Sequence, residues 1–141
     1  MKLLSRKELL AKQPLQVVKV ELDNDEFVYV RQMTGRERDR FELTLNKDVK
    51  DDKGNLVDVV QDYEDFRAKL AVQTICNEDG ELILQPEDYP ILSQHMGIQQ
   101  LDKIVKAAQK LNKISQADKE ALTKNSGGGQ AADSSSDSAK S

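Results

Sequence analysis

Residues 16–32 have the residue pattern of paired strands, so at least part of this chain must form a sheet. The segment contains VVKVEL, then DNDE, then FVYVRQ, and its β-branched residues are interrupted only by four polar turn formers. A turn centred on Asn24 and Asp25 would place Leu22 opposite Phe27. That register also pairs Val20 with Tyr29 and predicts a half-buried hairpin. Its core-facing side chains are Val18, Val20, Leu22, Phe27 and Tyr29.

Two capping boxes mark the starts of helices in the N-terminal half. Ser5 is followed three residues later by Glu8, and Thr34 by Glu37. At this spacing each side chain can accept a hydrogen bond from the backbone N–H of the other residue. The sequence therefore predicts a short helix through residue 12 and a second helix through about residue 46.

Two apolar patterns predict the helices that form the core. Asp62 can cap a helix that runs to about residue 76, and its broad apolar face places it at the centre of the core. In residues 98–111 apolar residues recur at helical spacing, so we expect Leu101, Ile104 and Val105 in the core rather than in a groove. Three lysines face away from them: Lys103, Lys106 and Lys110. Between these helices, residues 77–80 predict a turn, residues 82–84 a short buried extended piece, and Pro86 a helix start.

Two segments lack the pattern of a core-forming element. Residues 47–54 alternate Lys and Asp and end in Gly, which predicts a loop that extends to about residue 60. After a final short helix from Ser115 to about residue 124, residues 126–141 are rich in Ser and Gly, which predicts a disordered tail. We therefore expect one domain over residues 1–125. Its fold class is α+β and mainly α-helical, with an N-terminal β-hairpin packed on a small helical bundle.

Charge and cysteine content narrow the class of partner. The chain has 21 basic and 25 acidic residues, a formal net charge of −4, and both signs are mixed along its length. This mixture argues against capture of nucleic acid or of an anionic membrane surface. A single cysteine cannot form an internal disulfide, and no apolar stretch has the length of a membrane span. These features predict a protein of a reducing cytoplasm.

A search for catalytic patterns predicts no enzyme, no cofactor and no metal site. His95 and Cys76 are single residues of their type, so no zinc-ligand spacing exists, and the Asp/Gly turns at 51–54 and 77–80 lack the end ligands of an EF-hand. We expect His95 at a surface or helix end and Cys76 as a small buried side chain. The aromatic residues are expected in the core: Phe27, Tyr29, Phe41, Tyr63 and Phe66. The residues that bind a partner stay unassigned.

Three stretches, taken in order, resemble the tail assembly chaperones of long-tailed bacteriophages. They are the hairpin running into MTGRERDRFE at 33–42, the helix-to-turn passage ICNEDG at 75–80, and the segment from residue 98 through Leu111-Asn112 to Ser115. The resemblance implies a mainly helical fold with a small β element and no catalysis. It extends to prophage relatives of these proteins.

The same resemblance implies what the protein binds. Members of the family bind the tape measure protein, keep it soluble, and help recruit tail tube subunits around it. They act in the cytoplasm of the host bacterium and leave before the particle is finished, so we expect the protein to be absent from the mature virion. Many are also made in a longer form by a programmed ribosomal frameshift.

Two alternative functions stay open, together with one property of the chain. The protein could instead be a structural tail or head–tail joining component of the virion. A small nucleic-acid-binding regulator, acting through the helix at 98–112 and its three lysines, is the other alternative. Self-association is a further expectation, because the apolar face of residues 63–75 could exceed what one domain buries.

Overall fold

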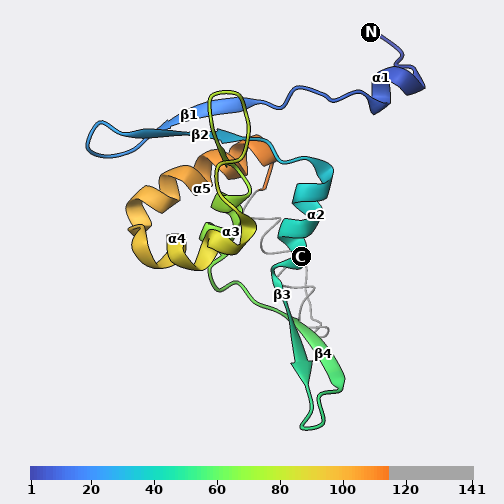
Figure 1. Cartoon of the computed structure of the whole chain (residues 1–141), viewed down its shortest axis with the longest axis vertical. Coiled ribbons are helices and arrows are strands. Elements are labelled where there is room, and N and C mark those ends of the chain that lie inside the picture. Colours follow the sequence, from blue (N-terminus) through green and yellow to red (C-terminus); the bar gives the residue numbers. More distant parts are fainter. Residues whose placement is uncertain (115–141) are drawn as a thin grey trace, which may run out of the picture.

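The computed structural model describes residues 1–114 as a mixed α+β protein, which confirms the predicted fold class (Figure 1). The helical elements are α1 (Arg6–Leu10), α2 (Gly35–Leu43), α3 (Phe66–Val72), the 3₁₀ helix η1 (Pro86–Asp88), α4 (Tyr89–His95) and α5 (Ile98–Asn112). The strands are β1 (Val17–Glu21), β2 (Phe27–Arg31), β3 (Asn46–Lys50), β4 (Leu56–Gln61) and β5 (Ile75–Cys76). The expected helix from Ser115 and the expected tail at 126–141 lie outside the described residues.

Both predicted capping boxes form. The Ser5 side chain accepts from the backbone N–H of Glu8, and Thr34 does the same for Glu37, while each glutamate accepts from the backbone N–H of its cap residue. The helix that Thr34 opens is shorter than predicted, because α2 ends at Leu43. The two capping boxes therefore predicted where each helix begins but not where it ends.

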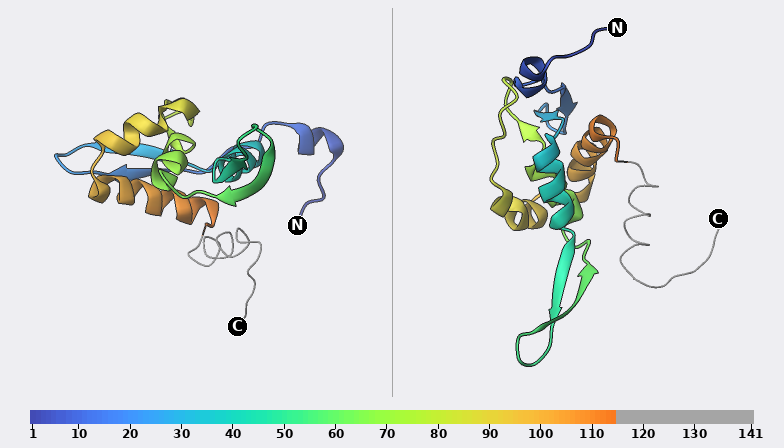
Figure 2. Two further views of the ribbon diagram at one scale, coloured as in Figure 1. Left: turned by 90° about the horizontal axis from the view of Figure 1, so that it is seen from below. Right: turned by 90° about the vertical axis from the view of Figure 1, so that its right-hand side faces the viewer.

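The first sheet packs on the helices through one face of the N-terminal hairpin. Strands β1 and β2 are antiparallel, and β5 pairs with the other edge of β2, which gives the order β1-β2-β5. Val20 lies opposite Val28, and both lie on the face that includes Val30, which is fully buried. Helix α5 packs against β1 and β2, so the hairpin closes one side of the core (Figures 1 and 2).

The predicted register of this hairpin was wrong by one residue. The backbone N–H of Leu22 donates to the carbonyl of Glu26 at 2.8 Å, so the loop has three residues instead of the expected four. Asn24 and Asp25 both have positive φ, at 60° and 61°, which Asn and Asp tolerate better than most residues.

Because strand side chains alternate between faces, the shift turns two aromatic residues away from the core. Phe27 is 48% exposed, and Tyr29 lies on the same outer face. The ammonium of Lys19 lies 4.5 Å from the centre of the Phe27 ring. The expectation of core positions holds for Phe41 and Phe66, which are buried, but it was wrong for Phe27 and Tyr29, which lie outside the core.

Helix α3 is the centre of the core, as predicted, although it is shorter than the sequence indicated. It begins at Phe66 instead of near Asp62, and Ala68, Leu70 and Ala71 have no exposed surface. After α3 the chain becomes extended at Ile75 to pair with β2. The apolar pattern of residues 62–76 predicts one continuous helix, but pairing of Ile75 with β2 ends the helix before that residue.

Helix α5 has the predicted apolar face. Leu101, Ile104, Val105 and Ala108 are buried, and α5 packs against α3 as well as the first sheet. The expectation that these residues fill the core instead of lining a groove is confirmed. Ile98, at the first position of the same helix, is 56% exposed.

The segment between β5 and α4 is partly as predicted. The side-chain oxygen of Asn77 accepts from the backbone N–H groups of Asp79 and Glu81, each at 2.9 Å, which forms the expected turn. Gly80 has a φ of +81° there. The expectation of a buried piece at 82–84 was wrong for Ile83, which is 57% exposed.

The loop predicted at 47–60 is instead a second hairpin. Strands β3 and β4 pair antiparallel, with Lys47 opposite Val60 and Val49 opposite Asp58. The alternating Lys and Asp residues hid β3, since neither face of that strand is buried. This hairpin extends away from the rest of the fold (Figures 1 and 2).

The packing of α5 leads to a test of stability. Ile104→Ala removes a fully buried side chain, so we expect the free energy of unfolding to fall by about 2–5 kcal/mol. The matched control Ile98→Ala lies on the same helix but is mostly exposed, and it should change that free energy by about 0.5 kcal/mol or less. Chemical denaturation of the two variants measures the difference, and equal losses would contradict the assigned core face.

Candidate partner-binding surfaces

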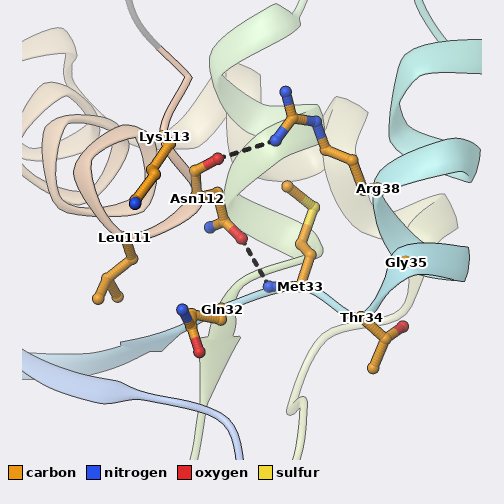
Figure 3. Close-up of a pocket in the computed structure, with 8 residues that line it drawn as sticks. All are labelled: Gln32, Met33, Thr34, Gly35, Arg38, Leu111, Asn112 and Lys113. Carbon is orange, nitrogen blue, oxygen red and sulfur yellow. Dashed lines mark hydrogen bonds between the residues drawn. The ribbon is translucent and has the colours of Figure 1, made fainter. Parts of the chain in front are cut away.

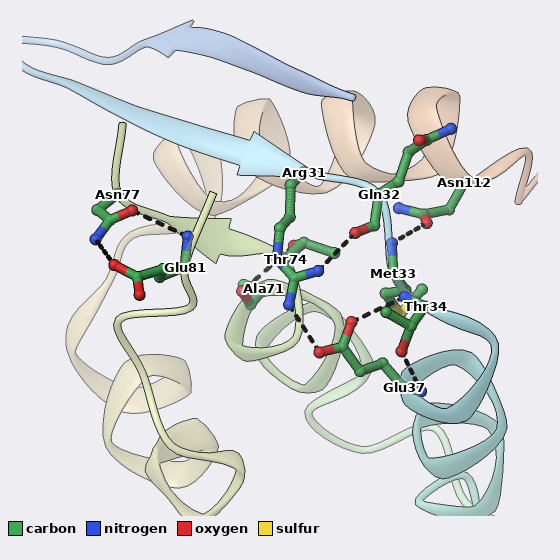
Figure 4. Close-up of polar contacts among 10 residues, drawn as sticks. All are labelled: Arg31, Gln32, Met33, Thr34, Glu37, Ala71, Thr74, Asn77, Glu81 and Asn112. Atoms are coloured by element: carbon green, nitrogen blue, oxygen red, sulfur yellow. Dashed lines mark hydrogen bonds and ion pairs between the residues drawn. The ribbon is translucent and has the colours of Figure 1, made fainter. Parts of the chain in front are cut away.

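The joint between β2 and α2 is fixed by a buried ion pair. A guanidinium nitrogen of Arg31 lies 2.7 Å from a carboxylate oxygen of Glu37, and the Arg31 residue is only 6% exposed. The other oxygen of Glu37 accepts from the backbone N–H of Thr34 at 2.9 Å (Figure 4). Glu37 therefore caps α2 and neutralises a buried charge of the sheet, which sets how the helix leaves β2.

Asn112, at the end of α5, binds this joint from the other side. Its side-chain oxygen accepts from the backbone N–H of Met33 at 2.7 Å, and its backbone carbonyl accepts from the Arg38 guanidinium at 2.8 Å (Figure 3). The Asn112 amide nitrogen donates to the carbonyl of Ala108 at 2.9 Å, which holds the side chain in place. Two segments far apart in sequence are thus joined by hydrogen bonds.

A pocket of about 360 Å³ lies beside this contact. Arg38 and Lys113 bring two positive charges to it, and Gln32 and Asn112 bring amide groups (Figure 3). Arg38 is also ion-paired with Glu42 at 3.2 Å, which fixes its position. The positive charges of Arg38 and Lys113 suit the pocket to non-covalent binding of polar groups.

The β3–β4 hairpin and the end of α2 beside it present exposed apolar side chains. We define the hairpin surface as five residues with exposed fractions from 37% to 67%: Leu43, Val49, Leu56, Val57 and Val59. A second pocket, of about 390 Å³, lies at its base and is lined by Leu43, Asn46 and Gln61 among others. Exposed apolar groups gathered on a projecting hairpin and on the helix end beside it are typical of a protein interaction site.

Sequence reasoning assigned no residue to partner binding, so the hairpin surface was missed. The signal was present, because residues 56–60 contain three valines and a leucine around Asp58. The neighbouring run of charges at 47–53 concealed that signal, since strand patterns are recognised by apolar alternation.

His95 and Cys76 lie where the sequence predicted. His95 is exposed at the C-terminal end of α4, and Cys76 is buried in β5. Burial raises the pKa of the Cys76 thiol above its ordinary value, while the nearby charge of Arg31 opposes that shift. A raised pKa lowers the thiolate fraction, so this cysteine is a poor nucleophile at neutral pH.

The three lysines of α5 do not act as one unpaired basic patch. Lys103 is ion-paired with Asp23 in the first hairpin at 2.9 Å, whereas Lys106 and Lys110 are exposed.

Within residues 1–114, no three His, Cys, Asp or Glu side chains gather as a metal site. The helices of that same region are too short or too polar to cross a membrane.

Comparison with known proteins gives a result that bears on the fold. No protein-family model and no curated protein matches the sequence. Among solved structures, the fold is similar to that of the bacteriophage HK97 tail assembly chaperone. The two chains superpose with a TM-score of 0.52 and 13% sequence identity, over 78% of this chain and 94% of the HK97 chain. At this identity the similarity establishes a shared fold, which agrees with the fold expected from the sequence resemblance.

The contact between Asn112 and Met33 can be tested by substitution. Asn112→Ala leaves the backbone N–H of Met33 without its acceptor, so we expect a loss of about 1–3 kcal/mol in the free energy of unfolding. The control Lys110→Ala changes an exposed residue of the same helix and should be close to neutral. Denaturant melts would refute the assignment if both variants matched the wild type.

The tip of the β3–β4 hairpin gives a prediction for pH. Backbone N–H groups of Asn55 and Lys53 donate to the Asp51 carboxylate, each at 2.9 Å, and the Asn55 bond is the main cause that lowers the Asp51 pKa below 3.8. Because the Asp51 pKa is lower in the folded state than in the unfolded state, the charged carboxylate stabilises the hairpin at any pH above the ordinary aspartate pKa. This stabilisation is lost as the pH falls through the lowered pKa of the folded state.

We therefore expect the Asn55 amide resonance to titrate in NMR spectra with a midpoint below pH 3.8. Asp51→Asn should abolish this titration and leave the other resonances in place. A midpoint at or above the ordinary aspartate value would show that the turn does not favour the charged carboxylate.

Proposed function

We propose that this protein is a non-enzymatic chaperone of bacteriophage tail assembly, which binds the tape measure protein and helps recruit tail tube subunits around it. The observation that carries this proposal is the similarity of its fold to that of the HK97 tail assembly chaperone. The ordered sequence resemblance supports it independently. Two of its three stretches meet where Met33 and Arg38 bind Asn112, and the third includes β5 and the turn after it.

The hairpin surface provides a physical means for this activity. A tape measure protein has long amphipathic helices whose apolar stripes would aggregate before tube subunits cover them. Exposed side chains such as Val57 and Leu56 can cover part of such a stripe, and burial of apolar area on both partners favours the complex. We assign the hairpin surface as the contact with the tape measure protein.

The proposal includes where and when the protein acts. It works in the cytoplasm of the host bacterium and leaves before the virion is complete, and nucleic acid and membrane are not among its partners. A longer form made by ribosomal frameshifting would carry an additional partner-binding segment. Self-association is part of the same proposal, since several copies would be needed to cover a long helix.

Co-expression with the tape measure protein of the same phage genome tests the proposal. We expect the tape measure protein to become soluble and to co-purify with the tagged chain. Val57→Lys places a charge on the hairpin surface and should reduce the co-purified yield several-fold. Ile91→Lys is the matched control, because Ile91 is 61% exposed on α4, close to the 60% of Val57.

Two results would contradict parts of the proposal. No change in tape measure solubility and no co-purification would remove the chaperone function, whereas an equal loss in both variants would remove only the hairpin assignment. Quantitative mass spectrometry of purified particles distinguishes a departing chaperone from a virion component. A stoichiometric copy number in mature particles would favour the structural alternative.

A further inference from the structure

A third pocket, of about 290 Å³, contains two buried polar side chains with unused hydrogen-bonding capacity. It lies between the end of α2, the C-terminal part of α3, η1 and the start of α4. Val72, Pro86 and Tyr89 form apolar walls, and Lys69 and Gln73 are the buried polar residues. These two residues are four positions apart, so they lie side by side on one face at the end of α3.

Lys69 is a buried cation without an anion. The residue is only 7% exposed, and its ammonium donates to the backbone carbonyl of Thr44 at 2.8 Å. It also lies 5.3 Å from the centre of the Tyr89 ring. Among the ion pairs within residues 1–114, none includes Lys69. An ammonium has three N–H donors, and only one of them is used in the bond to Thr44. The buried charge also lacks a counter-charge within residues 1–114.

Gln73 adds a neutral donor beside that charge. The residue is 6% exposed, and its side-chain amide makes no hydrogen bond within residues 1–114. The amide still has some contact with solvent, because among those residues Arg31 Nε is the only fully buried side-chain nitrogen or oxygen without a partner. An amide that keeps contact with solvent in the pocket has a donor and an acceptor free for a ligand. Both groups line the same pocket, so one ligand can satisfy both.

We propose that this pocket binds the carboxylate of an acidic side chain from a partner polypeptide. One carboxylate oxygen accepts from the Lys69 ammonium and the other from the Gln73 amide nitrogen, while the aliphatic stem packs on Val72 and Tyr89. Charge complementarity selects the carboxylate, since a buried ammonium gains most from an anion. This inference goes beyond the proposed function and does not depend on which protein the partner is.

Glu87 makes the pocket selective. This residue lines the pocket but is exposed and has no ion pair within residues 1–114. Its negative charge opposes every carboxylate that enters the pocket, so a ligand that brings one carboxylate is favoured over a ligand that brings two.

The experiment uses small probes of an acidic side chain and the full-length protein. N-acetyl-glutamate N-methylamide presents the carboxylate as it occurs within a polypeptide, and N-acetyl-glutamine N-methylamide is its neutral isostere. In ¹H–¹⁵N NMR titrations we expect saturable shifts at Lys69, Gln73 and Thr44 with the glutamate probe. Binding of the neutral probe should be about tenfold weaker or more. Free glutarate should also bind more weakly, because it brings a second charge near Glu87.

Two variants make the result specific. Lys69→Met keeps a side chain of similar length and removes the charge, and a dispersed ¹H–¹⁵N spectrum of the variant would show that it is folded. It should abolish the shifts caused by the glutamate probe. Glu87→Gln should strengthen binding of that probe and of glutarate, because it removes the repelling charge.

Each contrary result overturns the proposal. Equal binding of the two capped probes, or undiminished binding to folded Lys69→Met, would show that Lys69 does not recognise a carboxylate. Tighter binding of glutarate than of the capped probe would assign the pocket to a small free acid instead of a polypeptide. Absence of saturable shifts would show that the pocket binds neither.

Discussion

The buried face of α5 is the contact on which the rest of the fold depends. Hairpin β1–β2 packs on this helix, and α3 packs on it as well, so its apolar residues join the N-terminal hairpin to the middle of the described chain. Ile104 and Ala108, which are fully buried, lie at the centre of that contact. Removal of this helix would leave one face of the small sheet exposed, and a short hairpin without a packed face is at best marginally stable in water.

Polar contacts then convert this packing into a defined geometry. Apolar burial is not directional, so it does not determine the angle at which α2 leaves the sheet. The Arg31–Glu37 ion pair fixes that angle at one end, and the hydrogen bonds of Asn112 hold the same joint against α5. The β3–β4 hairpin follows α2 directly, with Thr44 and Leu45 between them. The position of the hairpin surface relative to the core therefore depends on these few bonds.

Sequence reasoning was accurate where a local signal determined the structure. Both capping boxes follow from contacts within a few residues, and the buried faces of α3 and α5 follow from the spacing of apolar residues along each segment. It was wrong where contacts between distant parts of the chain determine the structure. Ile75 joins the sheet because β2 has an open edge, and the register of the first hairpin follows from left-handed residues in a three-residue loop. The β3–β4 hairpin has no buried face, so its strands lack the alternation that marks β1 and β2.

The candidate sites were harder to predict for a related reason. A partner-binding surface is defined by groups that the fold leaves unsatisfied, and a sequence does not show which groups these are. Arg31 and Lys69 are both buried cations, and nothing in their local sequence distinguishes them. Arg31 is neutralised by Glu37 within the protein, whereas Lys69 has a carbonyl and an aromatic ring but no anion. The fold therefore accounts for the charge of Arg31, while the charge of Lys69 is explained by a carboxylate that another polypeptide supplies.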